Sequence, residues 1–196
     1  MRSAAADDAA VIESSRREPE RFAVLFDRHA PHIYRYLARR AGRQAADDLV
    51  AETFLAAFAK RDRYDLSHAD ARPWLYGIAT NLVGQHRRDE VRQYRIRQAA
   101  AAEPEVPGHA DRVAADVTAQ AMRSLLYPAL AALPAGDRDV LLLIAWEQLT
   151  YEEVSRALAI PVGTVRSRLH RARTKVRQVL AGTDAAATYE EITANE

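Results

Sequence analysis

The stretch Thr150–Arg173, which reads TYEEVSRALAIPVGTVRSRLHRAR, carries the strongest structural signal in the sequence. Its first residues form a Thr-x-x-Glu capping box between Thr150 and Glu153, which marks the start of a short helix. A turn at Ile160-Pro161 leads into a last helix, expected from about residue 162 to 181. A capped short helix, a tight turn and a second helix are typical of a helix-turn-helix.

The expected last helix is strongly basic, because no acidic residue lies between Pro161 and Thr183. Its apolar residues recur at steps of four and three, so one face can pack while the other faces outward. A basic helix of this kind fits the major groove of DNA, although a merely solvated face would carry the same charges. The residues predicted to contact DNA are Thr164, Arg166, Ser167, His170, Arg171, Arg173 and Lys175.

Residues 119–182 are expected to form one small C-terminal domain, in which helices over 119–133 and 137–149 precede the helix-turn-helix. Upstream, residues 99–118 hold two prolines, a glycine and a net charge of −3. This composition predicts a flexible linker with a reach on the order of 25 Å. The acidic tail, residues 183–196, is expected to be disordered.

Residues 19–98 are expected to form a second helical domain, whereas residues 1–18 are polar and predicted to be disordered. Pro19 and Pro31 are each placed to open a helix. A third helix should follow, and Asp70 can cap a long fourth one. Because no convincing strand is found, the sequence predicts an all-α fold of two small helical domains joined by a flexible linker.

Charge and composition narrow the class of protein. The 196-residue chain has a net charge of +1, yet residues 21–98 carry +6 and residues 119–181 carry +4. Two basic blocks suggest two surfaces for a polyanion, although solvated helix faces would also explain them. The chain has no cysteine, which excludes disulfides and zinc ribbons, and no apolar run long enough to span a bilayer. We expect a soluble, cytoplasmic protein with no membrane insertion, metal or cofactor.

Two long motifs resemble the sigma-70 family of bacterial RNA polymerase subunits, particularly its extracytoplasmic-function (ECF) branch. Similarity to region 4 is carried by Leu133-Pro134, Arg138, Val140, Leu149–Val154 and Pro161–Arg173. Similarity to region 2 is carried by DDLVAETFL at Asp47–Leu55 and RPWLYGIATNL at Arg72–Leu82. Only these two domains match, which points to the small ECF branch.

The resemblance implies that Asp47–Leu55 docks on the polymerase core, at the clamp helices of the β′ subunit, with the β flap as a further contact. Acidic groups around an apolar centre suit a basic helix pair. The favourable helix dipole is an alternative explanation for the two aspartates, but it explains Glu52 less well. The residues predicted to bind the core are Asp47, Asp48, Leu49, Glu52 and Phe54.

The resemblance also implies that Arg72–Leu82 reads the promoter −10 element, while the helix-turn-helix reads the −35 element. Holding unpaired bases requires pockets, aromatic surfaces and cations. The residues predicted to contact −10 DNA are Tyr64, His68, Arg72, Tyr76, Asn81, Gln85, Arg87 and Arg88.

The predicted function is therefore that of an ECF sigma factor, a non-enzymatic subunit that binds core polymerase and selects promoters. The resemblance implies a further partner, because members of this branch are commonly held inactive by an anti-sigma factor. The alternative is a free-standing helix-turn-helix regulator that binds an operator, which would not need the two region 2 motifs. An enzyme is disfavoured, because the sequence contains no nucleotide-binding motif and no HExxH motif. His29 and His32 are spaced like a metal-binding pair, but Pro31 lies between them and no carboxylate cluster follows.

Overall fold

The computed structural model describes residues 7–100 and 128–182, and every regular element in these two ranges is helical. The fold class is therefore as predicted. Most of the expected linker, the start of the helix predicted over 119–133 and the acidic tail lie outside the described residues. Among the described helices, none is long and apolar enough to cross a bilayer.

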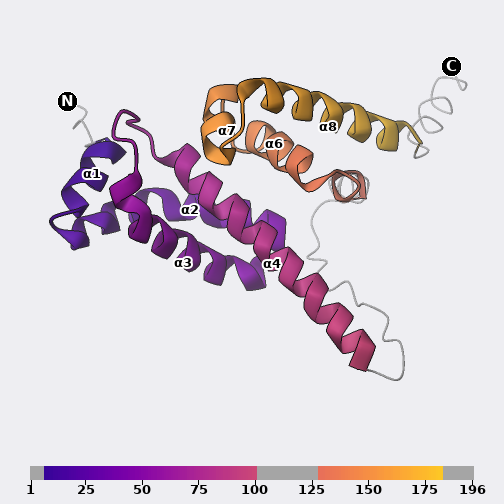
Figure 1. Ribbon diagram of the computed structural model, residues 1–196, viewed down its shortest axis with the longest axis horizontal. Coiled ribbons are helices and arrows are strands. Elements are labelled where there is room, and N and C mark those ends of the chain that lie inside the picture. Colours follow the sequence, from indigo (N-terminus) through magenta and orange to yellow (C-terminus); the bar gives the residue numbers. More distant parts are fainter. Residues whose placement is uncertain (1–6, 101–127, 183–196) are drawn as a thin grey trace, which may run out of the picture.

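The first domain is built on α2 (Ala23–Ala41), α3 (Arg43–Lys60) and the first half of α4 (Arg72–Ala100), which pack against one another (Figure 1). Gly42 separates α2 from α3 with a φ of +83°, a conformation that glycine adopts without strain. At the start of α4, the side chain of Asp70 accepts the Arg72 amide at 2.8 Å, as the sequence predicts. The largest fully buried side chains here are Ile12, Leu25, Ile33, Tyr36, Leu37, Leu75, Tyr76 and Val83.

Pro31 lies inside α2 and does not open a new helix, so the predicted break is wrong. A proline at this position removes one backbone hydrogen bond. However, Leu25, His29, Ile33 and Leu37 are all buried on the stripe that faces the core, on both sides of the proline. Packing of this continuous stripe outweighs the lost bond. Pro19 instead opens a short 3-10 helix, η1 (Pro19–Phe22), which leads directly into α2.

The N-terminal segment is ordered where the sequence predicts disorder, because α1 spans Asp8–Ser15. The Asp7 carboxylate caps this helix and accepts the Ala10 amide at 2.7 Å. Ile12 is fully buried and Val11 nearly so, which anchors the helix in the core of the first domain. Two adjacent large apolar residues give no helical period, so the pattern did not reveal this element.

The second domain contains α6 (Ala135–Ala145), α7 (Tyr151–Leu158) and α8 (Val162–Gly182). The predicted capping box is present, with the Glu153 amide 3.2 Å from the Thr150 hydroxyl and the Thr150 amide 2.7 Å from the Glu153 carboxylate. α6 ends four residues earlier than predicted, since the chain turns at Gln148 with a φ of +56°. The buried core of this domain comprises Val140, Leu143, Val154, Val165, Leu169 and Ala172.

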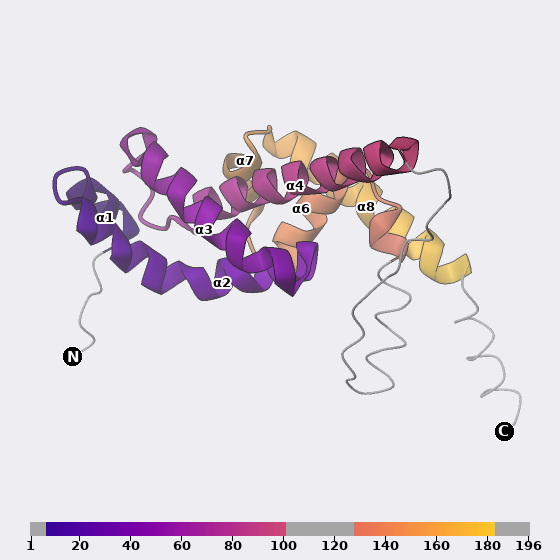
Figure 2. The ribbon, with the colours of Figure 1, turned by 90° about the horizontal axis from the view of Figure 1, so that it is seen from below.

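The two domains lie side by side along the first half of α4, while the second half of α4 extends beyond them (Figures 1 and 2). α7 packs directly on α4, and α6 touches it as well. At this crossing Gly77 lies against the carbonyl group of Ala157, and a Cβ atom at position 77 would overlap it. Glycine is therefore required for this close approach.

Candidate nucleic-acid interface

The outer face of α8 is free and basic, as the sequence predicts. Its opposite face buries Val165, Leu169 and Ala172 against the rest of the second domain. Thr164 is half-buried in the first turn, and its carbonyl accepts the Ser167 hydroxyl at 3.1 Å. The exposed side chains of the predicted set are Arg166, Ser167, His170, Arg171, Arg173 and Lys175.

Arg171 differs from the other residues of this set, because its guanidinium group is paired within the domain. Its Nε and Nη2 atoms donate to the two carboxylate oxygens of Asp137 at 3.0 and 2.9 Å. These hydrogen bonds raise the pKa of Arg171, and they join α8 to the first turn of α6. In the free chain the Asp137 carboxylate thus occupies two donors of the planar Arg171 fork, while the side chain stays exposed. The DNA contact of Arg171 remains a prediction.

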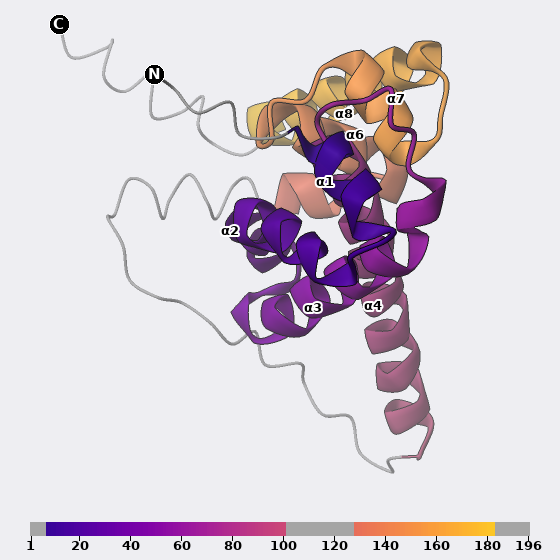
Figure 3. The same cartoon turned by 90° about the vertical axis from the view of Figure 1, so that its left-hand side faces the viewer.

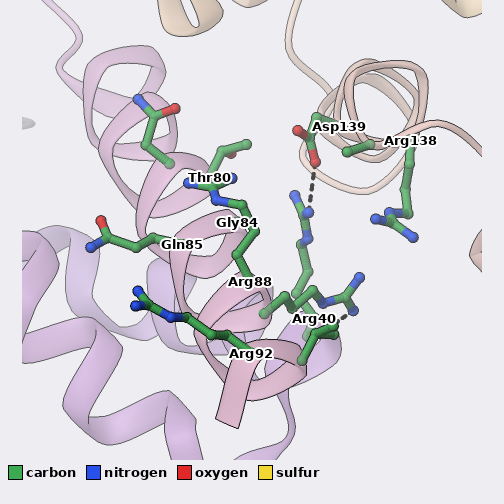
Figure 4. A pocket seen from close by; sticks show the side chains of 12 residues that line it. Arg40, Thr80, Gly84, Gln85, Arg88, Arg92, Arg138 and Asp139 are labelled. Carbon is green, nitrogen blue, oxygen red and sulfur yellow. Dashed lines mark hydrogen bonds and ion pairs between the residues drawn. The ribbon is translucent and has the colours of Figure 1, made fainter. Parts of the chain in front are cut away.

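Three of the predicted −10 residues lie on one exposed face of α4, at steps of four and three: Asn81, Gln85 and Arg88. They line a cleft of about 1230 Å³ between α4 and α6 (Figure 4). The spacing places an amide, a second amide and a guanidinium group along one path. These are groups that can bond base edges and phosphates.

The cleft is strongly positive, with five arginines and one carboxylate among its lining residues. Its floor is formed by Arg40, whose Nη2 atom lies 2.6 Å from the Asp139 carboxylate (Figure 4). Burial, and then the charges of neighbouring arginines, lower the pKa of Arg87 and of Arg138. Crowding of like charges favours an anionic ligand. The lining arginines are Arg40, Arg87, Arg88, Arg92 and Arg138.

Two predicted −10 residues, Arg72 and Tyr76, were expected to face DNA. They face the second domain instead. Tyr76 is fully buried, and its hydroxyl donates to the Glu147 carboxylate at 2.5 Å. Burial, and then this carboxylate, raise the pKa of Tyr76. The Arg72 guanidinium donates to the Glu147 carbonyl oxygen at 3.1 Å. We call this contact between the two domains the closed arrangement. In it Tyr76 is not available to DNA, and Arg72 is half-buried. Arg87, a sixth −10 candidate, is half-buried, and its guanidinium donates to the Arg40 carbonyl oxygen.

The loop between α3 and α4 contains the last two of the eight −10 candidates. Tyr64 is buried, its ring lies 4.9 Å from that of Trp74, and its hydroxyl donates to the His68 carbonyl at 2.7 Å. The His68 side chain is about one-third exposed. Both residues line a cavity of about 440 Å³, together with Asn81 of α4 and Arg156 of α7. The loop is therefore a folded wall of this cavity.

The predicted core-binding residues divide into two groups on α3. Asp47, Asp48 and Glu52 are exposed, whereas Leu49 and Phe54 belong to the core and cannot form the apolar centre of a docking surface. That part of the prediction is corrected. The exposed apolar side chain on this face is instead that of Leu55, which is 68% exposed and lies one turn beyond Glu52. The steps of four and three from Asp48 to Glu52 and to Leu55 are the signal that could have identified it.

The two histidines considered as a metal pair have separate partners. The Nε2 atom of His29 lies 2.8 Å from the Asp8 carboxylate, while the Nδ1 atom of His32 lies 2.6 Å from the Arg35 guanidinium. Burial, and then Arg35, lower the pKa of His32. Within the described ranges, no group of three or more potential ligand residues could hold a metal ion.

Asp8 is a buried carboxylate whose charge contributes to stability. Burial alone would raise its pKa, but hydrogen bonds from His29, from the Ala71 amide and from Arg28 lower it to about 2. Its ordinary value is 3.8, so the stabilisation is complete above that pH and is lost as the pH falls through 2.

We therefore expect the unfolding free energy lost on Asp8→Asn to be on the order of 2 kcal/mol larger at pH 6 than at pH 2. Urea denaturation followed by circular dichroism measures this difference. Asp7→Asn, at the exposed cap, is the matched control. A loss that does not change with pH would show that the Asp8 charge is not involved.

The fold and its surfaces define a class: a two-domain helical DNA-binding protein with one helix-turn-helix and a second basic cleft. Comparison with known proteins gives the family. The family model "Sigma-70 region 2" matches residues 25–93, and "Sigma-70, region 4" matches residues 123–176. The chain belongs to the sigma-70 family, within its ECF branch.

Curated relatives and solved structures agree with this assignment. The ECF RNA polymerase sigma factor SigE of Mycolicibacterium smegmatis is 36% identical over 80% of this chain, which spans 60% of that protein. The RNA polymerase sigma factor CarQ of Myxococcus xanthus is 34% identical over 81% of this chain and 88% of its own length. CnrH, solved with the cytosolic domain of CnrY, shares the fold at 23% identity, with a TM-score of 0.63 over 91% of this chain and 99% of CnrH.

Proposed function

We propose that this chain is a non-enzymatic, cytoplasmic subunit of RNA polymerase that selects promoters. The first domain binds the core enzyme and the −10 element, and the helix-turn-helix binds the −35 element. The observation that carries this proposal is the presence of both sigma regions in one chain, with the outer face of α8 free and basic. A free-standing regulator is disfavoured, because it would not need region 2.

The core-binding surface that we propose lies on α3 and consists of Asp48, Glu52 and Leu55. Two carboxylates beside an exposed leucine offer an apolar contact with an acidic rim, which suits a basic partner helix. The β′ clamp helices are the proposed partner. This assignment is supported by the exposure of all three side chains and by their spacing along one helix face.

The closed arrangement of the domains does not match the spacing of two promoter elements. Elements centred 25 base pairs apart are separated by roughly 85 Å along B-form DNA. α4 and α7 are instead in direct contact, and Glu147 holds Arg72 and Tyr76. We propose that the domains separate when the chain joins polymerase.

An anti-sigma factor is a further proposed partner. RpoE from Bartonella quintana, which shares this fold, was solved in complex with the anti-sigma factor NepR.

Binding to core polymerase without DNA distinguishes a sigma factor from a free-standing regulator. The fluorescently labelled chain, titrated with purified core enzyme, should show a saturable rise in anisotropy in the absence of any promoter. A regulator would bind its operator alone and would give no such rise. Absence of binding to core, together with tight binding of the free chain to duplex DNA, would contradict the proposal.

Two arginines of α8, Arg166 and Arg171, should respond differently to truncation. Arg166→Ala should cost roughly 1–3 kcal/mol of −35 binding and relax base preference at one position, because this side chain is exposed on the outer face of α8. Arg171→Ala should instead lower the melting temperature of the second domain, since it leaves the buried Asp137 carboxylate without its partner. Anisotropy with −35 variants and thermal denaturation measure the two effects. Equal outcomes for both variants would contradict this division.

A further inference from the structure

The N-terminal helix α1 contacts the end of the α3–α4 loop that leads into α4 (Figure 3). The Asp8 amide donates to the Ala69 carbonyl at 2.9 Å, and the Asp8 carboxylate accepts the Ala71 amide at 2.9 Å. That carboxylate is also held by Arg28 at 2.7 Å and by His29 at 2.8 Å, both from α2. A single buried side chain therefore ties the loop to two helices.

The other end of α1 contacts the beginning of the same loop. The Nη2 atom of Arg16 lies 3.2, 3.2 and 3.3 Å from the carbonyl oxygens of Arg61, Asp62 and Tyr64. In return, the Nε atom of Arg61 donates to the carbonyl of Ser15 at 3.3 Å. The Arg61 carbonyl also accepts the Tyr64 amide at 3.2 Å, within the short 3-10 helix η2 (Arg61–Arg63) that begins this connection. Arg16 therefore adds side-chain hydrogen bonds to a segment with little regular structure of its own.

We propose that α1 is the positioning element of this loop, with Arg16 and Asp8 as its positioning residues. The inference rests on the proposed function, in which the first domain binds the −10 element, and on the sequence prediction that Tyr64 and His68 of this loop take part. Between the two anchored ends the loop is closed by the bond from the Tyr64 hydroxyl to the His68 carbonyl. Flipping a base out of the stack costs free energy, and a pocket that is already ordered loses less conformational entropy when the base binds. α1 supplies that order.

The chain offers a matched control in two adjacent arginines. Arg16 contacts three carbonyls of the connection, whereas the side chain of the neighbouring Arg17 is exposed. Both substitutions with alanine remove one positive charge from the same place. Arg16→Lys keeps the charge but loses the planar group that spans several acceptors.

Hydrogen exchange of the full chain tests the structural half of the proposal. Amides of residues 64–71 should exchange at least tenfold faster in Arg16→Ala than in the wild type, and Arg17→Ala should leave their exchange unchanged. Arg16→Lys should fall between the two. Unchanged exchange in both Arg16 variants, or equal acceleration in Arg16→Ala and Arg17→Ala, would overturn the role of α1.

The reconstituted holoenzyme tests the functional half. With purified core polymerase, Arg16→Ala should reduce open-complex formation on duplex promoters about tenfold and flatten base preference in the −10 element. Preference in the −35 element and core affinity should not change, and a template already mismatched at −10 should restore most of the loss. Arg16→Lys should recover part of it.

Equal losses at −10 and −35, or a loss that the mismatched template does not restore, would show that α1 contributes only general stability. Arg16→Lys equal to the wild type would assign the effect to charge and overturn the geometric role. If wild-type protein selects no promoter at all, the proposed function fails. The exchange comparison then still decides whether α1 orders the loop.

Discussion

Gly77→Ala should open the two domains without unfolding either of them. A Cβ atom at position 77 would overlap the Ala157 carbonyl, which belongs to the backbone of α7 and cannot move aside like a side chain. The closed arrangement should therefore become a minor species. Alanine is favoured over glycine in a helix by roughly 0.5–1 kcal/mol, so the first domain itself should be as stable as before or slightly more so.

The matched control for this substitution is Gly84→Ala, on the same helix. A Cβ atom there would meet only the Arg88 side chain, at 3.6 Å, which is an ordinary contact. Because the chain has no cysteine, single cysteines introduced at the exposed residues Ala59 and Thr174 allow specific labelling. Energy transfer between the labels should fall in Gly77→Ala and remain at the wild-type level in Gly84→Ala.

Opening should also release two side chains for DNA. Arg72 and Tyr76 lose their contacts with Glu147 when α7 leaves α4, so the free Gly77→Ala protein should bind single-stranded −10 DNA more tightly than the wild type. Unchanged energy transfer in Gly77→Ala would contradict the closed arrangement in solution. Opening without any gain in DNA binding would contradict the roles of Arg72 and Tyr76.

Glu52→Arg should weaken association with core polymerase roughly hundredfold, or about 3 kcal/mol, because placing like charges together at an interface costs several kcal/mol. Glu52 is exposed on α3, so its reversal should leave the thermal stability of the free chain within about 0.5 kcal/mol. Titration of core enzyme with labelled protein, at several salt concentrations, measures the effect.

Glu20→Arg is the control for this reversal, since Glu20 is also exposed and acidic but belongs to η1 and not to the α3 surface. It should leave core affinity unchanged. Equal affinities for wild type and Glu52→Arg would remove the docking surface assigned to α3. Equal losses in both variants would reduce it to an effect of net charge.

Local patterns in the sequence predicted the helix-turn-helix closely. The capping box from Thr150 to Glu153 is formed as written, and α8 covers almost the predicted range, from Val162 to Gly182. These features depend on residues a few positions apart, where capping chemistry and apolar spacing act directly. The same patterns misjudged Pro31, since the core packing that keeps α2 continuous involves other helices.

Features that depend on distant residues could not be predicted. The Tyr76 hydroxyl meets the Glu147 carboxylate across 71 residues, and the Arg171 fork meets Asp137 across 34. No local spacing encodes such pairs, because they arise only when whole helices pack. Leu49, Phe54 and Leu55 show the same limit at short range, since a motif identifies a helix but does not state which of its residues face the core.

Transcription in vitro with purified core polymerase and a promoter library decides whether this chain is a promoter-selecting subunit. Adding the chain should produce defined start sites, productive promoters should share two elements about 25 base pairs apart, and Glu52→Arg should abolish the product at limiting protein. A chain that confers no start-site selection on core enzyme, while binding duplex DNA tightly by itself, would contradict this function.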